Sequence, residues 1–600
     1  MNVGPVPVAN ADAVTSEYSR FGPRKLEEHL AGFSKGNPGL YATELGRLLT
    51  ALNGSRLERM DRLVAMERLR PPVLDTCDTL VQGYRNLSLP LPEQAQQAAA
   101  ATTRLLALLN EGYKLSVNQR LAAREHGEPS HGPPLKLALQ RALLVGGRSL
   151  LEHYRLYAPE PTDLWRDVHC LYLNAEALKL QAQPFEAEGD RDETALAIKQ
   201  AYLRMVVLAL ANPHHLLQGE AAELYRRIGR WVHLVRLVEP HRWQELPGQF
   251  VVDLCGSLPP HYRSRERRLP TPDLPRIIQL DQLVAAVDDR LESLEGELAE
   301  RPSRAALGLR MQRNMYLRFR EALGGRQERV DTRRTTVARV SVVAGLSGCH
   351  FFLNGRRSFN PDADEARWTQ RLNGITEQTE PALTLSDSEY LTDPVTPAEP
   401  EGRRSAFRAR DPEVDDVWRR AHLVGIGESG AGAQRRAQYR AVTWNRKNVS
   451  AGGMALFCVD PVEMRMRVGE LMAYSDDGNA PPQAWKLAQV RWLRTRPDGG
   501  LEAGVRNVAD SGYAVGTKAV QGAGRDTEYL RGILVPRVNP LTEETTLLAP
   551  VGVYEPGTVL RLVMSDLSIY IKLTERVVTS QLFAHFRFRL VQPPAHLRGG

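Results

Sequence analysis

The spacing of the apolar residues changes near residue 325, and this change limits the fold more than any other feature of the chain. From Arg24 to about Gly325, apolar residues recur with the period of amphipathic α-helices. After that point, short apolar runs alternate with polar residues and are bounded by turn-forming residues, as in β-strands. The sequence therefore predicts a multidomain α + β protein, in which an all-α array of helical hairpins precedes antiparallel β-domains.

The predicted helical domain spans residues 23–325 and follows a flexible arm at residues 1–22, which are small and polar and include prolines. Proline-containing breaks divide the domain into helices. These are predicted at residues 40–52, 56–70, 73–84, 92–124, 135–157, 162–183, 193–212, 219–239, 283–298 and 305–323. Two short strands, 250–255 and 277–280, predict a small β annex near residues 250–280. Helical arrays usually bind proteins, so we expect an unidentified protein partner.

Composition and charge exclude several classes of protein. The chain has 600 residues and a formal net charge of +7, and its Lys and Arg residues form no block long enough for a nucleic-acid-binding arm. No apolar run reaches the roughly 18 residues of a membrane span. The N-terminus lacks the basic and apolar regions of an export signal. We therefore expect a cytoplasmic protein without a membrane span.

Motifs for catalysis are absent from the sequence. There is no H-E-x-x-H, no G-x-S-x-G and no set of Cys and His with metal-ligand spacing. Residues 425–430 match G-x-G-x-x-G, but only about eight residues separate them from the next strand, too few for the helix that binds a pyrophosphate. We expect a protein that is not an enzyme and that holds neither a metal nor a cofactor.

Residues 440–459 are organised around a small polar turn with the pattern Asn448-x-Ser450-x-x-Gly453. The apolar runs on each side predict two β-strands joined at this turn. Asn448 and Ser450 are short side chains that donate and accept hydrogen bonds. Gly452 and Gly453 allow positive φ angles and let a flat ligand approach the backbone. The pattern indicates a recognition site, although the same residue types also form purely structural turns.

Three more strand-like runs follow the turn, at residues 464–474, 485–493 and 501–508. The first carries Val-Gly-Glu, the second Val-Arg-Trp and the third Gly-Val, and a Pro-Asp-Gly-Gly turn joins the last two. In this order the residues resemble the PilZ domain, the bacterial receptor module for cyclic di-GMP. The resemblance implies a PilZ-like antiparallel β-barrel and a receptor that binds this second messenger.

The resemblance places the barrel at residues 326–510. An acidic segment rich in Pro and Thr, at about residues 355–435, is predicted to be a mobile insertion in it. Residues 511–600 are again rich in alternating apolar and polar positions and predict a second, C-terminal β-domain.

The resemblance also implies an Arg-x-x-x-Arg linker ahead of the first barrel strand. Two sequences fit: Arg329 to Arg333, followed by Arg334 and a strand-like run, and Arg436 to Arg440, directly before the strand that leads to the turn. We favour the first pair because PilZ domains have a full hairpin between the linker and the turn.

Cyclic di-GMP has two phosphates and two guanines. A guanidinium group can bind a phosphate bidentately, pair with guanine O6 and N7, and stack on the purine face. The ligand-binding residues that the resemblance implies are Arg329, Arg333, Arg334, Asn448, Ser450, Gly452 and Gly453, with Arg436 and Arg440 as the alternative pair.

We interpret the chain as a receptor that senses cyclic di-GMP through the barrel and signals through its helical protein-interaction domain. A second hypothesis is a scaffold whose degenerate barrel binds no ligand. A third is a nucleic-acid-binding protein, which the positive charge and small barrels would suit, but the sequence lacks the interleaved aromatic residues that stack on bases.

Overall fold

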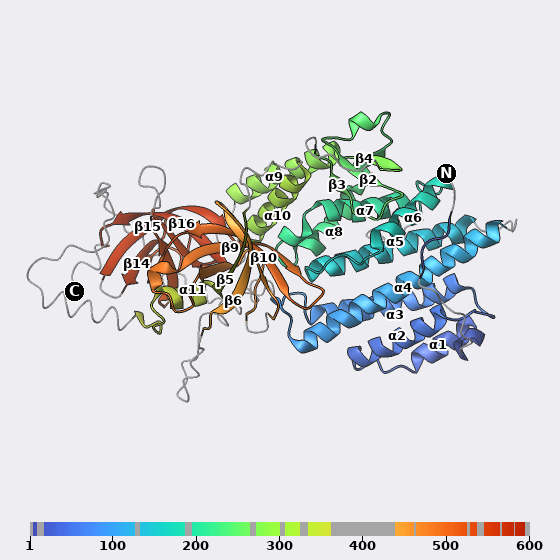
Figure 1. Ribbon diagram of the computed structural model, residues 1–600, viewed down its shortest axis with the longest axis horizontal. Helices are drawn as coiled ribbons and strands as arrows, with labels where there is room; N and C mark the ends of the chain where they lie inside the picture. The colour runs from blue at the N-terminus through green and yellow to red at the C-terminus, as the bar shows by residue number, and fades with distance from the viewer. Residues whose placement is uncertain are drawn as a thin grey trace, which may run out of the picture. The chain divides into compact units, whose positions relative to one another are not determined.

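The computed structural model describes residues 4–8, 17–125, 132–185, 195–264, 272–300, 306–324, 334–361, 439–460, 464–524, 528–536, 545–564, 567–580 and 582–593. The chain forms two compact units, one mainly helical and one made mainly of β-strands. Figure 1 shows the chain, with labels on its α-helices and on some of its strands.

Amphipathic helices make up most of the first unit. They are α1 Pro23–Ala31, α2 Pro38–Asn53, α3 Arg62–Gln82, α4 Glu93–Glu125, α5 Gly132–Arg155, α6 Leu164–Ala177, α7 Ile198–Leu210, α8 Glu220–Trp231, α9 Asp281–Ala299 and α10 Leu307–Leu323. Neighbours in sequence pack together, with α3 on α4, α4 on α5 and α7 on α8. The apolar face of each helix is thereby buried, as the periodicity of the sequence predicts.

Helix α3 corrects the prediction of two helices, 56–70 and 73–84, in this region. It begins after Asp61, whose carboxylate accepts the Leu63 N–H at 2.8 Å, and it continues through Pro71 and Pro72. A proline inside a helix removes a hydrogen bond and normally kinks or ends it. Here Leu69 and Val73, on either side of the prolines, are both fully buried, so packing keeps the helix continuous.

The segment after α8 also differs from the predicted helix 219–239. Helix α8 ends at Trp231, a short 3₁₀ helix follows, and the chain then extends into strand β1 Arg236–Val238. This strand pairs with β4 Pro275–Gln279, and β2 Phe250–Asp253 and β3 His261–Tyr262 complete a sheet with the order β1-β4-β2-β3. A strand edge was available for β1, and tertiary pairing replaced the helical propensity of its residues.

Within the predicted flexible arm, the described residues 4–8 are held in place. Residues 4–8 lie against α4 and α6, and Val6 is only 1% exposed. The Val6 N–H donates to Asn118 Oδ1 at 2.7 Å, and the Gly4 N–H donates to Asn174 Oδ1 at 3.2 Å. For residues 4–8 the prediction was wrong because it considered local composition, whereas the partners of this segment are more than a hundred residues away.

Six strands form the first barrel. They are β5 Arg334–Ala344, β6 Val442–Ser450, β7 Gly453–Cys458, β8 Leu471–Ser475, β9 Lys486–Thr495 and β10 Leu501–Ala509, closed in the order β10-β7-β6-β5-β8-β9. The β5–β6, β6–β7, β5–β8 and β8–β9 pairs are antiparallel. Val340 faces its cross-strand partner Trp444, and both are fully buried. Alternate side chains of the strands therefore point inward and fill the interior of this barrel.

Strand β8 is shorter than the predicted strand 464–474. Met464, Met466 and Val468 alternate with more exposed residues and are buried, but the ladder with neighbouring strands begins only at Leu471. Gly469 has a φ of 86°, a conformation that interrupts an extended strand. Alternating burial thus predicted which side chains point inward but not where strand pairing begins.

A second closed barrel follows directly. Its strands are β11 Tyr513–Gln521, β12 Leu530–Val535, β13 Thr546–Pro550, β14 Val559–Met564, β15 Leu567–Thr579 and β16 Phe583–Val591, in the order β11-β12-β13-β16-β15-β14. Leu547, Ile571 and Phe586 are fully buried in its core. The predicted α + β fold class with a helical domain and β-barrels is confirmed.

Helix α11 Leu346–Leu353, which was not predicted, packs against strands of both barrels. Phe352 packs on Trp485 of the first barrel, with ring centroids 4.6 Å apart, and Leu353 lies in the same apolar cluster as Ile533 of the second. The two barrels therefore share one continuous apolar cluster through α11.

The predicted insertion at about 355–435 lies mostly outside the described residues. Its first residues belong to the folded unit, because the Phe359 ring lies 5.2 Å from that of His350 and Pro361 is buried. Arg531 of the second barrel also stacks on Phe359, with its guanidinium 4.8 Å from the ring centroid. The start of the insertion at 355 was wrong, since these aromatic contacts could not be read from the local sequence.

Candidate functional site

The Asn448–Gly453 sequence forms the hairpin between β6 and β7. Asn448 pairs with Ala455 and Ser450 with Gly453, which leaves Ala451 and Gly452 at the tip. The Ser450 hydroxyl donates to the Gly453 carbonyl at 3.2 Å. The local sequence thus folds as predicted, into two strands that present an amide and a hydroxyl beside an exposed tip.

Asn507 of β10 holds this tip from the neighbouring strand. Its N–H donates to the Gly452 carbonyl at 3.0 Å, and its side-chain amide donates to the Ala451 carbonyl at 3.3 Å. Its side-chain carbonyl accepts from the Tyr474 hydroxyl at 3.1 Å. Two hydrogen bonds from Asn507 therefore fix the hairpin tip against β10, and the third, from Tyr474, orients the Asn507 side chain. Sequence reasoning missed Asn507, because its role depends on barrel closure.

The two turn glycines do not adopt the positive φ angles that were predicted, whereas their contact with a flat ligand stays a prediction. Neither Gly452 nor Gly453 has a positive φ. A Cβ atom at Gly453 would lie 2.0 Å from the Val505 carbonyl oxygen and 3.1 Å from the Arg506 Cα. Gly453 is therefore required by the close approach of β7 and β10, which is a steric reason and not a conformational one.

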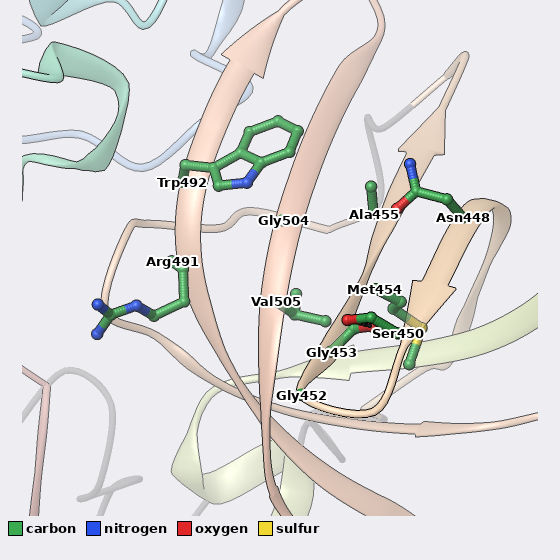
Figure 2. Close-up of a pocket in the computed structure, with 10 residues that line it drawn as sticks. All are labelled: Asn448, Ser450, Gly452, Gly453, Met454, Ala455, Arg491, Trp492, Gly504 and Val505. Carbon is green, nitrogen blue, oxygen red and sulfur yellow. Dashed lines mark hydrogen bonds between the residues drawn. The ribbon is translucent and has the colours of Figure 1, made fainter. Parts of the chain in front are cut away.

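A shallow pocket opens beside the turn. It is lined by Asn448, Ser450, Gly452, Gly453, Met454, Ala455, Arg491, Trp492, Gly504 and Val505, and its volume is about 170 Å³. Figure 2 shows Asn448 and Ser450 on the hairpin and Trp492 on the facing strand β9, with β10 between them. The pocket thus brings together four predicted site residues, and adds residues of β7, β9 and β10 that the prediction omitted.

The indole of Trp492 lies over the backbone of Gly504. A Cβ atom at Gly504 would lie 1.8 Å from the indole Nε1, so only glycine leaves space for this packing. The ring is half-buried and belongs to the pocket lining. An aromatic face in such a position can stack on a nucleobase. The Val-Arg-Trp and Gly-Val signatures contained this signal, because a small residue facing an aromatic one on paired strands indicates close packing.

Replacing Gly504 with Ala is expected to displace the Trp492 indole from the pocket without unfolding the barrel, since a half-buried side chain can move outward. The tryptophan fluorescence maximum should shift to longer wavelength, and cyclic di-GMP binding should weaken about tenfold, since stacking on an aromatic ring contributes roughly 1–3 kcal/mol per base.

The control is Gly499→Ser in the β9–β10 loop, where a side chain meets open space. That variant carries only the strain of a φ of 81° and should leave the ligand affinity within about twofold of wild type. Unchanged binding by Gly504→Ala, together with a shifted fluorescence maximum, would exclude the indole from the site.

The residue that follows the predicted arginine linker lies at the end of β5 that is close to the pocket turn. Arg329 and Arg333 lie outside the described residues, but Arg334 begins β5, is exposed and pairs with Val449. The next residue, Thr335, pairs with Asn448. The register therefore places the chain that follows Arg333 beside the pocket turn.

Arg440 lies at the other end of β6. It precedes Val442 and lies eight positions before Asn448 along a nearly extended strand, a distance of roughly 25 Å. The structure does not bring Arg440 together with the turn, and Arg436 lies outside the described residues. The alternative arginine pair thus gains no support from the part that is described.

The two basic residues directly before Asn448 both have acidic partners. Arg446 donates to Asp476 at 2.6 Å, and Lys447 donates to Glu502 at the same distance. Each pair spans one intervening strand of the first barrel, because Asp476 directly follows β8 and Glu502 lies in β10. We therefore assign these two residues to the barrel and not to the recognition of a phosphate.

The Val468-Gly469-Glu470 sequence positions strand β9. The Gly469 N–H donates to the Val490 carbonyl at 2.8 Å, and the Val490 N–H donates to the Glu470 carbonyl at 2.9 Å. These bonds fix the strand that carries Trp492. Burial raises the pKa of the Glu470 side chain to about 7, and the nearby Arg467 opposes this shift only in part.

Replacing Glu470 with Gln is expected to stabilise the protein above pH 7. Because its pKa is raised from 4.5 to about 7, the folded state keeps a proton that the unfolded state releases. The free energy of unfolding therefore falls as the pH rises through this window. The variant should be more stable than wild type by roughly 3 kcal/mol at about pH 8, and the difference should vanish at about pH 4.

Urea unfolding at the two pH values measures this difference. Glu575→Gln is a matched control, because Glu575 is exposed and pairs with Arg587 at 2.7 Å on the second barrel. We expect it to change stability by less than about 1 kcal/mol at either pH. A Glu470→Gln variant with the same pH dependence as wild type would show that Glu470 is ionised in the folded protein.

Three family models match successive parts of the chain. The model described as "Cyclic-di-GMP receptor FimW, N-terminal domain" matches residues 24–241. The models of the FimW middle PilZ domain and of the FimW C-terminal beta-barrel domain match residues 249–513 and 515–591. This chain belongs to the FimW family. The predicted resemblance to PilZ proteins is therefore confirmed.

The FimW family includes a curated relative that spans almost the whole chain. The cyclic-di-GMP receptor FimW of Pseudomonas aeruginosa is 25% identical over 578 residues, which cover 95% of this chain and 91% of the relative. No solved structure matches the chain. The FimW middle-domain match begins at residue 249, so it includes α9 and α10 as well as the first barrel.

Two further features are missing from the described residues. They contain no cluster of three His, Cys, Asp or Glu side chains that could hold a metal ion. None of the described helices has the length and apolar character needed to cross a membrane.

Proposed function

We propose that this chain is a cyclic di-GMP receptor, and that the ligand binds between the Arg329–Arg333 linker and the Asn448–Gly453 turn. The observation that carries the proposal is the β5–β6 register, in which Arg334 faces Val449 and Thr335 faces Asn448. This register places the residues that directly follow the arginine linker beside the turn, which supports a joint site. The family match over the same residues supports it.

The size of the pocket supports a ligand held from two sides. At about 170 Å³ it is smaller than the roughly 300–1,000 Å³ of typical ligand pockets, so it can take one guanine but not a whole cyclic dinucleotide. We assign the guanine edge to Asn448 and Ser450 and its face to Trp492. The phosphates and the second guanine are then left to the arginines of the linker.

The arginines can supply much of the affinity. Each charge-assisted hydrogen bond contributes about 1.5–3 kcal/mol, and a micromolar dissociation constant corresponds to about 8 kcal/mol. Two or three arginines with a stacked base therefore suffice. Arg334 is exposed, so its contribution falls at the lower end of this range.

We also propose how the binding signal is used. The chain acts as a cytoplasmic binding protein and not as an enzyme, and its helical domain takes the response to a protein partner. The receptor name of the family supports the first point, and the two-unit organisation supports the second.

Calorimetric titration of the full chain tests the proposal. We expect saturable binding of cyclic di-GMP with a micromolar or lower dissociation constant and no heat of binding with GTP or linear GMP. Equal heats with GTP would point to a general phosphate site. No heat at millimolar cyclic di-GMP would identify the barrel as a scaffold that has lost the ligand.

A further inference from the structure

Residues 4–7 are held by side chains that form hydrogen bonds with their backbone. Asn118 of α4 accepts the Val6 N–H at 2.7 Å and donates to the Val6 carbonyl at 2.8 Å. Asn174 of α6 does the same with Gly4, accepting its N–H at 3.2 Å and donating to its carbonyl at 2.9 Å. Each asparagine therefore pairs with both polar groups of a single residue, as a neighbouring β-strand would.

Lys114 adds a contact at the end of the segment. Its ammonium group donates to the Pro7 carbonyl at 3.1 Å, and also to Asp167 at 2.9 Å and Glu111 at 2.7 Å. Lys114 and Asp167 are buried. An ammonium group has three donors, and here each has an acceptor, one of which is the backbone of the N-terminal segment.

The sequence of the segment suits this kind of recognition. The asparagines contact residues 4 and 6, and the positions between and after them are Pro5 and Pro7, which have no N–H to leave unpaired. Prolines also restrict the unbound chain to extended conformations and so lower the entropy lost on binding. One side chain is deeply buried, that of Val6, whereas Pro5 is exposed and a Cβ at Gly4 would meet open space.

We propose that α4 and α6 form a groove for an extended, proline-containing peptide with one small apolar side chain, and that residues 4–7 occupy it in cis. Its ligand in trans is a segment of a partner protein with the same x-Pro-Val-Pro chemistry. Backbone contacts carry no information about most side chains, so a segment from another chain can make the same bonds. The groove identifies one class of protein partner for the helical domain.

The proposal is tested with the full chain from which residues 1–9 are deleted and with a fluorescent peptide of residues 1–10. Fluorescence anisotropy should show saturable binding to the shortened chain and none to the intact chain, whose groove is filled. Asn118→Ala in the shortened chain should weaken binding at least about tenfold, because two hydrogen bonds are lost. The matched control, Gln119→Ala, replaces the exposed neighbour on α4 and should stay within about twofold.

Two peptide variants test the side-chain requirement. Val6→Asp in the peptide should abolish binding, because it places a carboxylate in the buried position, and Gly4→Ala should bind like the parent peptide. Failure of a correctly folded shortened chain to bind the peptide would overturn the proposal. Equal weakening by Asn118→Ala and Gln119→Ala would also overturn it.

A third measurement applies if the shortened chain does not fold. A site for a specific protease is inserted after Asn10 of the intact chain. The protein is allowed to fold and is then cleaved at this site. The proposal expects the cut segment to dissociate and to exchange with labelled peptide. A segment that stays bound after cleavage and does not exchange would be a permanent part of the helical core, and the groove would not be a binding site.

Discussion

The Gly453→Ala variant is expected to lose about 3 kcal/mol or more of unfolding free energy in the barrel unit, since overpacking of this kind costs 1–3 kcal/mol and here meets rigid backbone. The added Cβ would lie 2.0 Å from the Val505 carbonyl oxygen and 3.0 Å from its carbon. Neither atom belongs to a side chain that could rotate away. The variant should therefore separate β7 from β10 and disturb the pocket that both strands line.

Urea unfolding followed by near-ultraviolet circular dichroism measures this loss. Gly296→Ala in α9 is the matched control, because Gly296 is exposed and a Cβ there meets open space. It should be neutral or stabilising by up to about 1 kcal/mol, as expected for alanine in a helix. A Gly453→Ala protein as stable as the control would mean that β7 and β10 are farther apart than the structure shows.

Alanine at Arg333 is expected to weaken cyclic di-GMP binding about thirtyfold, or about 2 kcal/mol, since it removes a bidentate contact and a stacking partner together. The chain after Arg333 enters β5 at the residues that face the pocket turn. Alanine at Arg436 should cost less than about 0.5 kcal/mol, as for a general surface charge. The two variants have the same charge, so any general electrostatic effect is equal in both.

One calorimetric titration of each variant makes the comparison, and a melting curve shows that both proteins still fold. If Arg436→Ala abolishes binding and Arg333→Ala does not, the clamp belongs to the segment that precedes β6. In that case the segment would have to fold back along β6, because Arg440 precedes the start of this strand and Asn448 lies near its end.

The fold class and the turn could be predicted because their signals are local. Amphipathic periodicity depends on neighbouring residues, and so does the hairpin that carries Asn448 and Ser450. The contacts of Asn507 with the β6–β7 tip, and the position of Trp492 beside that tip, depend on which strands meet when the barrel closes. A single sequence contains no direct record of that closure, so these residues were missed.

The errors also have physical causes that lie outside local sequence. Pro71 and Pro72 normally end a helix, but burial on both sides of them keeps α3 intact. Residues 4–8 have the composition of a free arm, but amides on α4 and α6 bind their backbone. In both cases tertiary contacts overrode a local preference, which is the usual limit of pattern-based prediction.

Hydrogen–deuterium exchange of the full chain, with and without cyclic di-GMP, tests the joint site most directly. We expect the ligand to slow amide exchange in two segments together, the linker at residues 326–334 and the turn at residues 448–453. Exchange in β15 and β16 of the second barrel should not change. Protection of the turn without the linker, or protection elsewhere in the chain alone, would contradict a ligand held between the two.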